Sequence, residues 1–131
     1  MCIFCKIANH EIPSKIVYED DKFIAFLDLT QTTIGHTLVI PKRHSKNIYE
    51  LNEDDAKEML MVVKKVALML KKAFNPIGIN IISNNEKPLQ SVEHFHIHLI
   101  PRYENDDFDI DFHDHSKSVD LDEILNKILS V

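Results

Sequence analysis

Three histidines alternate with apolar residues in the last third of the chain: His94, His96 and His98. In an extended strand successive side chains point to opposite faces, so the three imidazoles share one face and the apolar residues between them face a core. At a rise of about 3.3 Å per residue, His94 and His98 stand about 13 Å apart, too far for all three rings to bind one metal ion easily. The pattern therefore predicts separate roles, and histidine suits proton transfer, attack on phosphorus and metal ligation at neutral pH.

Two other functional patterns remain open from the residues alone. His96 and His98, together with His36, could form an open catalytic zinc site, because histidines at i and i+2 can bind one metal ion. That hypothesis requires turnover that a chelator abolishes. The cysteine pair Cys2 and Cys5 has the close spacing of half a zinc site, whose other half must come from elsewhere, and the same spacing also occurs in redox-active or free thiol pairs.

One long helix and several strands are predicted to position these residues. Asn52 or Glu53 marks the start of an amphipathic helix of about five turns, and Asn75 followed by Pro76 marks its end. The apolar residues of this helix recur at the helical spacing: Met59, Val62, Val63, Val66, Leu70 and Phe74. The apolar runs 23–28, 37–41, 78–82 and 94–101 read as strands, with a loop at 83–90.

The predicted fold is an α+β domain with an antiparallel sheet of about five strands, one long helix and short terminal helices. The segment 104–114 is acidic and poor in packing residues, so it reads as a loop. Helical spacing then returns in a short C-terminal helix: Leu121, Ile124, Leu125 and Ile128. We expect one domain over residues 1–131, in which 104–131 form a variable C-terminal extension.

Composition limits the classes of partner. The chain has 131 residues, 44% of them hydrophobic, which suffices for one sizeable core. Its formal net charge of −6 argues against a generic nucleic-acid or membrane-surface binder, since those proteins need a basic face. No apolar stretch approaches a membrane span and the first residues lack the pattern of a signal peptide, so we expect a cytoplasmic protein.

Several motifs resemble the histidine triad (HIT) family of nucleotide hydrolases and transferases, over residues 2 to about 103. The triad strand, residues 94–100, is preceded by Gln90, Ser91 and Val92 as in that family. The other similar blocks follow in family order: residues 3–7, 11–16, 26–28 and 35–44. The loop before the triad departs from the pattern, because Leu89 stands where related sequences usually place a glycine.

The resemblance implies catalytic roles for four residues. His96 would attack the α-phosphorus of a nucleotide and form a nucleotidyl-imidazole intermediate. His98 would donate to the phosphate oxygens, and His36 would complete the cluster. Ser91 would contact the phosphate and assist protonation of a departing amine, and Gln90 resembles a second contact to the phosphate and leaving group.

The resemblance also implies a nucleoside site. Asp28 would accept hydrogen bonds from the ribose hydroxyls. An asparagine that contacts the ribose-phosphate region in relatives falls at Ser83 by strict counting or at Asn84 with a slip of one residue, and we favour Asn84. An apolar slot with few base-specific groups suggests a purine nucleotide of the AMP or GMP type, and the residues that match it are Phe4, Ile7, Phe26 and Leu29.

HIT proteins that carry two N-terminal cysteines imply a structural zinc ion. Its ligands here would be Cys2, Cys5, His44 and His94. Two thiolates and two neutral imidazoles balance the charge of the ion, and a closed tetrahedral set leaves no position for a catalytic water.

The function that follows is hydrolysis of nucleoside phosphoramidates or related nucleoside monophosphate conjugates. Two alternatives remain: a dinucleoside polyphosphate hydrolase, and a nucleotide-binding regulatory module with vestigial activity. The resemblance further implies a homodimer that pairs through the long helix and a neighbouring strand. This chain offers a surface for it, because apolar residues of the helix lie outside the core stripe: Leu60, Met61, Ala67, Leu68 and Met69. The competing hypothesis is a monomer in which the C-terminal segment around 121–128 covers those residues.

Overall fold

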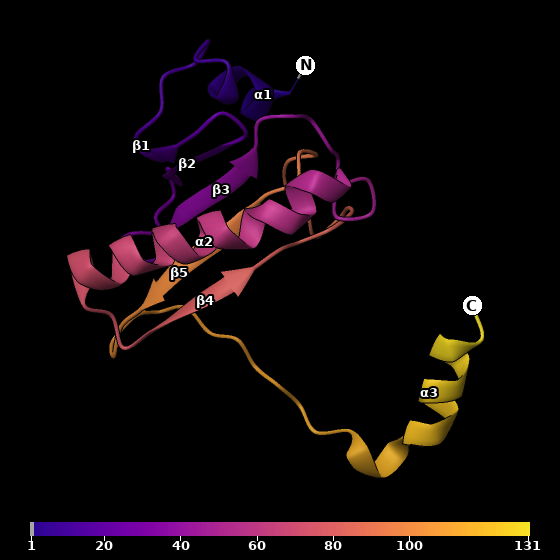
Figure 1. Ribbon diagram of the computed structural model, residues 1–131. Coiled ribbons are helices and arrows are strands. Elements are labelled where there is room, and N and C mark those ends of the chain that lie inside the picture. Colours follow the sequence, from indigo (N-terminus) through magenta and orange to yellow (C-terminus); the bar gives the residue numbers. More distant parts are fainter. Residues whose placement is uncertain (1) are drawn as a thin grey trace.

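A five-stranded antiparallel sheet in the order β1-β2-β3-β5-β4 organises the protein (Figure 1). The computed structural model describes residues 2–131. Each strand pair is antiparallel, and α2 lies across one face of the sheet, so the predicted α+β class is confirmed. The elements are α1 (Ile3–Ala8), β1 (Ile16–Glu19), β2 (Phe23–Leu27), β3 (Thr37–Pro41), α2 (Glu53–Phe74), β4 (Gly78–Ile82), β5 (Ile97–Arg102), a 3-10 turn (Ser116–Ser118) and α3 (Leu121–Leu129).

Helix α2 begins and ends at the predicted signals. The side chain of Asn52 accepts hydrogen bonds from the backbone N–H groups of Asp54 and Asp55, which satisfies donors that the first turn leaves free. Acidic residues in the first turn and lysines in the last turn complement the helix dipole. Asn75 ends the helix with a left-handed φ of 47°, a conformation that asparagine tolerates better than most residues.

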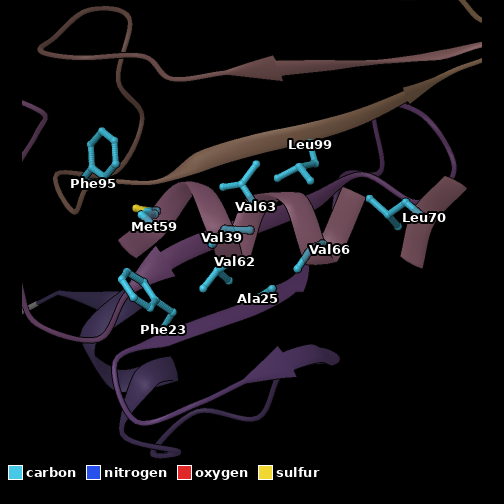
Figure 2. Close-up of a cluster of buried hydrophobic side chains, with 10 residues drawn as sticks. All are labelled: Phe23, Ala25, Val39, Met59, Val62, Val63, Val66, Leu70, Phe95 and Leu99. Atoms are coloured by element: carbon cyan, nitrogen blue, oxygen red, sulfur yellow. The ribbon is translucent and has the colours of Figure 1, made fainter. Parts of the chain in front are cut away.

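The main core lies between α2 and the sheet. Figure 2 shows the side chains of α2 directed toward those of β2, β3 and β5. Phe95, the apolar residue between the first two triad histidines, belongs to this core and is 3% exposed. The cluster consists of Phe23, Ala25, Val39, Met59, Val62, Val63, Val66, Leu70, Phe95 and Leu99.

A second apolar cluster includes α1 and residues of β2 and β3 that alternate with those of the main core. It contains Phe4, Ile7, Ala8, Ile24, Phe26, Leu38 and Ile40. Strand pairing sets Phe26 opposite Leu38, and Leu38 opposite His98. These three residues therefore form one row across β2, β3 and β5, and the sheet turns His98 away from α2.

The structure differs from the sequence prediction in the start of one strand and in the presence of another. β5 begins at Ile97 and not at residue 94, because the backbone N–H of Phe95 donates to Ser45 O at 2.7 Å, in a loop outside the sheet. β1 was not predicted, since its four residues are exposed to half-buried and carry no clear alternation. The strands at 37–41 and 78–82 coincide with β3 and β4.

The C-terminal segment lies apart from the rest of the chain. Every residue from 111 to 131 is exposed, and Figure 1 shows α3 well away from α2. The hypothesis that residues 121–128 cover α2 within one chain is therefore wrong: Leu60, Met61, Leu68 and Met69 remain 44–69% exposed. Among residues 2–131, no helix combines the length and apolar character that crossing a membrane requires.

Candidate active site and metal centre

A cavity of about 260 Å³ opens on the face of the sheet opposite α2. Such a volume is close to the lower end of the range for small-molecule sites, about 300–1,000 Å³. His96 and His98 line it, together with the residues predicted to hold a nucleoside and the predicted proton donor: Phe4, Ile7, Phe26, Asp28, Leu29 and Ser91. The structure thus brings eight of the predicted site residues to one recess.

His96 is held in a defined orientation and tautomer. Its Nδ1 lies 2.7 Å from the backbone oxygen of His94, which can only accept a hydrogen bond, so Nδ1 carries the proton. The Nε2 atom of the neutral ring is then left with a free lone pair. The ring is 2% exposed and packs edge-on against Phe4 at a centroid distance of 5.2 Å.

His98 is oriented by a second chain of hydrogen bonds. The backbone N–H of Thr32 donates to His36 Nδ1 at 3.3 Å, so the proton of the neutral His36 ring is on Nε2. His36 Nε2 in turn donates to His98 Nδ1 at 2.9 Å. The proton of His98 is therefore on Nε2, where it can donate to a ligand. The rings of His96 and His98 are 5.0 Å apart.

Burial keeps this cluster neutral. It lowers the pKa of His36 and of His96, with Asp28 acting in the opposite direction on both. Burial, followed by the nearby His96 and His36, lowers the pKa of His98 to about 4. Neutral imidazoles are the forms that the hydrogen-bond pattern requires, and a neutral ring can act as a nucleophile without losing a proton first.

Asp28 supplies the negative charge of the site. Burial raises the pKa of its carboxyl, but the hydroxyl and backbone N–H of Thr30, each donating to Oδ1, outweigh that effect and lower it. The other oxygen, Oδ2, lies 3.7 Å from His36 Nε2. The carboxylate is therefore ionised at neutral pH and keeps acceptor capacity toward the cavity.

Gln90 and Asn84 lie outside the cavity lining. Gln90 is 3% exposed and its amide is engaged by backbone groups: Nε2 donates to Lys46 O and Val92 O, and Oε1 accepts from Glu86 N. This side chain fixes the loop that carries Ser91. Asn84 is half-buried in the same loop. The ligand contacts expected of both residues stay predictions.

The cavity also contains residues that sequence reasoning did not assign to the site. Leu38 could have been found from strand pairing, because it stands between Phe26 and His98 in the row across the sheet. Val92 follows Ser91 in the motif. The others come from the turn after α1 and from the ends of α1 and β2, whose positions have no periodic signal: Ile3, Ile12, Pro13, Ser14, Lys15 and Leu27.

A second cluster has the geometry of a metal centre. The ligand atoms of Cys2, Cys5, His44 and His94 all lie within 4.8 Å of one another. His94 Nδ1 is 3.3 Å from Cys2 Sγ, 3.5 Å from Cys5 Sγ and 3.2 Å from His44 Nδ1. A zinc ion with bonds of about 2.0–2.1 Å to nitrogen and about 2.3 Å to sulfur has tetrahedral edges of about 3.3–3.8 Å. The four residues therefore fit zinc.

Surrounding groups favour the ligand form of His94 but not that of Cys5. His94 Nε2 lies 2.7 Å from Pro41 O, so the proton is on Nε2 and the Nδ1 lone pair faces the cluster. Burial lowers the pKa of His94 to about 4, which keeps the ring neutral. Burial and the adjacent Cys2 raise the pKa of Cys5 to about 11, so a cation is needed to hold the Cys5 sulfur as a thiolate.

The alternative catalytic zinc site does not gather as predicted. The group of potential ligands around the triad is Asp28, His36 and His98. His96 does not belong to this group, whose ligand atoms all lie within 4.8 Å of one another. The three residues that could bind a metal ion beside the triad therefore do not include His96.

Comparison with known proteins places this chain in a family. The HIT domain profile matches residues 9–105. The chain belongs to the HIT family.

Individual relatives are similar over most of their length. Protein hit of Bacillus subtilis is 53% identical over 103 residues, which are 78% of this chain and 71% of that protein. Adenosine 5'-monophosphoramidase of Schizosaccharomyces pombe is 41% identical over 102 residues, 77% of this chain and 74% of that enzyme.

Solved structures share the fold. A HIT family protein from Bacillus anthracis superposes with a TM-score of 0.92 at 44% identity, over 98% of this chain and 93% of that chain. A zinc-bound histidine triad family protein from Mycobacterium smegmatis has a TM-score of 0.77 at 32% identity, over 89% and 86% of the two chains.

Proposed function

We propose that this protein hydrolyses nucleoside phosphoramidates or related conjugates of nucleoside monophosphates, through a covalent intermediate on His96. The observation that carries the proposal is the hydrogen bond from His96 Nδ1 to His94 O, which leaves Nε2 unprotonated at the wall of the cavity. The relationship to the phosphoramidase of S. pombe supports the same reaction.

In the first step, His96 Nε2 attacks the α-phosphorus and the bond to the leaving nitrogen breaks. The new bond joins His96 to the nucleotidyl group, and the departing amine takes a proton from the hydroxyl of Ser91, which lines the cavity. His98 Nε2–H donates to a phosphate oxygen as charge builds up there, and His36 holds His98 in the tautomer that donates.

In the second step, water attacks the phosphorus and the bond to His96 breaks. The products are the nucleoside monophosphate and free enzyme, because water gives its oxygen and one hydrogen to phosphorus and its other proton returns to the Ser91 hydroxyl. Asp28 binds the ribose hydroxyls throughout, and the apolar wall formed by Phe4, Ile7 and Phe26 holds a purine base.

The decisive experiment is to mix the protein with an adenosine or guanosine 5'-phosphoramidate, quench in acid-free denaturant and measure the mass. We expect an added nucleotidyl group on the peptide that contains His96. An adduct on His98 would refute the assignment. A comparison of amidates with dinucleoside polyphosphates then distinguishes the main proposal from a polyphosphate hydrolase, and no turnover of any substrate would favour a regulatory binding module.

We also propose that zinc occupies the Cys2, Cys5, His44 and His94 cluster in a structural role. The tetrahedral spacing of the donor atoms supports it, and so does the zinc-bound relative from M. smegmatis. Bound zinc supplies a crosslink between α1 and the triad segment. His94, as a ligand, is also the residue whose carbonyl orients His96.

The exposed apolar residues of α2 support a homodimer, since two-fold dimers are the commonest oligomers. Light scattering at micromolar concentration tests it. A mass close to the 15.2 kDa of one chain would refute the dimer.

A further inference from the structure

Residues 104–131 form an arm that extends away from the sheet. The arm begins after β5, where Arg102 makes paired hydrogen bonds to Asp106 at 2.9 and 3.0 Å. Beyond residue 110 every side chain is exposed, and Figure 1 shows the arm carrying α3 clear of the remaining elements. The superposition on the B. anthracis protein covers 98% of the chain with a TM-score of 0.92 and therefore extends over the arm. The outward arrangement is thus shared with a crystal structure.

Helix α3 has an apolar face that lacks a cover within its own chain. Leu121, Ile124, Leu125 and Ile128 recur at the spacing of one helix face, and their exposed fractions are 43–76%. Asp120 caps the helix, but nine residues are too few for a helix to be stable alone in water, where about 12–15 are already marginal. Packing of this face against another surface would supply the missing stability.

The arm is also the acidic part of the molecule. It contains nine acidic and two basic residues, a formal charge of −7, whereas residues 1–103 carry +1. A partner surface for α3 should therefore combine apolar contact with positive charge.

One surface of the chain has that combination. A groove of about 300 Å³ lies between the second half of α2 and the start of β4. From residue 59 to 74 the only charged side chains of α2 are lysines, at 64, 65, 71 and 72. The residues that line this α2–β4 groove are Lys64, Ala67, Leu68, Lys71, Pro76, Ile77, Gly78 and Ile79.

We propose that the arm of one copy reaches a second copy and docks the apolar face of α3 into the α2–β4 groove, reciprocally in a two-fold dimer. The connecting segment 104–120 is long enough, because 17 extended residues span up to about 60 Å. Charge favours this occupant, since the acidic arm meets the lysines that border the groove. The inference concerns an interface and does not depend on the catalytic proposal.

The first test adds the same charge to either face of α3. Leu125→Asp places a carboxylate on the apolar face, and Asn126→Asp places one on the polar face as the matched control. Because a charge buried in an apolar contact is costly, we expect Leu125→Asp to raise the dimer dissociation constant at least about tenfold and Asn126→Asp to leave it within about twofold. Analytical ultracentrifugation measures both. Equal effects, or a wild-type protein that is monomeric throughout, would overturn the proposal.

The second test locates the groove. Leu68→Asp changes a groove residue that is 49% exposed, whereas Ile48→Asp changes an apolar residue of similar exposure, 51%, that lies outside both the groove and α2. We expect only Leu68→Asp to weaken the dimer, with the melting temperature of the monomer preserved in both variants because both side chains are exposed. A dimer that Leu68→Asp does not weaken, or that Ile48→Asp weakens as much, would refute docking of the arm in this groove.

A third test detects exchange of the arm directly. A tagged Leu125→Cys chain is mixed with an untagged Leu68→Cys chain and oxidised, and peptide mapping distinguishes the new bond from any made by Cys2 or Cys5. We expect a disulfide between the two chains, and much less with Leu60→Cys as the control. A doubly substituted chain that crosslinks within itself would place α3 on its own α2 and overturn the exchange.

Discussion

The Nδ1–H group of His96 donates to the backbone oxygen of His94 across 2.7 Å, so one residue of the metal cluster directly orients the proposed nucleophile. The side chain of His94 faces Cys2, Cys5 and His44, while its carbonyl faces the ring of His96. The position of His96 therefore depends on how firmly residue 94 is held.

Replacing His96 by alanine should remove turnover and keep binding. The attacking atom is lost, while the cavity walls formed by Phe4 and Phe26 remain, so kcat should fall by at least about a thousandfold. Stopped assays with an amidate and titration with a nucleoside monophosphate measure the two quantities. His113→Ala, which changes an exposed histidine of the arm, is the matched control. Full activity in His96→Ala would disprove the mechanism.

Ser91→Ala should act on the leaving group. If the hydroxyl protonates the departing amine, the rate should fall more for poor leaving groups than for good ones, by about 10²-fold for the poorest. A series of amidates of graded amine basicity gives the slope. Ser14→Ala changes a second serine of the same cavity and should leave the slope unaltered. The same slowing of every substrate would exclude a proton donor at residue 91.

Asp28→Asn should weaken ribonucleotides more than their 2′-deoxy analogues. A charge-assisted hydrogen bond to the sugar contributes about 1–3 kcal/mol, and only the ribonucleotide can lose the contact to its 2′-hydroxyl. Calorimetric titration of both analogues against wild type and variant gives the difference. Identical losses for the two analogues would mean that Asp28 supports the turn at Thr30 and not the ligand.

Metal analysis of the purified protein should find about one zinc ion per chain. Cys2→Ser combined with Cys5→Ser should abolish it, and a chelator should lower the melting temperature more than it lowers the rate of the chemical step. His113→Ala combined with His115→Ala removes two exposed histidines outside the cluster and should change neither quantity. Unchanged metal content in the cysteine variant would refute the site. If turnover instead fell in proportion to the loss of a metal ion bound by His36 and His98, the alternative catalytic zinc site would be favoured.

Asp106 should make the anchor of the arm sensitive to acid. Hydrogen bonds from Arg102 and from the backbone N–H of Tyr103 hold the pKa of its carboxyl well below the usual range. Because the folded-state pKa is lowered, the stabilisation is complete above the pKa of the unfolded chain, about 4, and is lost as the pH falls below it. When the pH falls from about 5 to about 3, the melting temperature of Asp106→Asn should therefore decrease less than that of the wild-type protein. Asp107→Asn is the control, and equal pH profiles for all three proteins would contradict the prediction.

Elements with a strong local signal could be predicted from sequence. α2 has apolar residues at every turn, a capping asparagine and a proline just past its end, so both boundaries were found. The predicted strand begins before β5 does, because the alternation of apolar residues continues through Phe95. The backbone N–H of Phe95 donates to Ser45 O and not to a neighbouring strand. Alternation reports which face a side chain takes, and it does not report ladder pairing.

The site was predictable where chemistry and spacing coincide. Eight predicted residues line the cavity because the triad and Asp28 lie at strand ends that the sheet brings together. Gln90 shows the limit: an amide reads as a ligand contact in sequence, whereas its three hydrogen bonds here go to backbone groups of the nearby Glu86 and Val92 and of Lys46, a tertiary partner. Such tertiary partners have no signature in local sequence.

Phe26, Leu38 and His98 form one row across the sheet, so the position of His98 in the cavity depends on the register of β5 against β3. A shift of β5 by one residue against β3 would turn His98 under α2 and present Leu99 to the cavity, because side chains alternate between the faces. The segment between β4 and β5 is constrained as well, because it carries Ser91, His94 and His96 to their places beside β5. A single insertion within β5 would therefore damage the core and the site together, because it would place a histidine under α2 and turn the core residue Leu99 toward the opposite face.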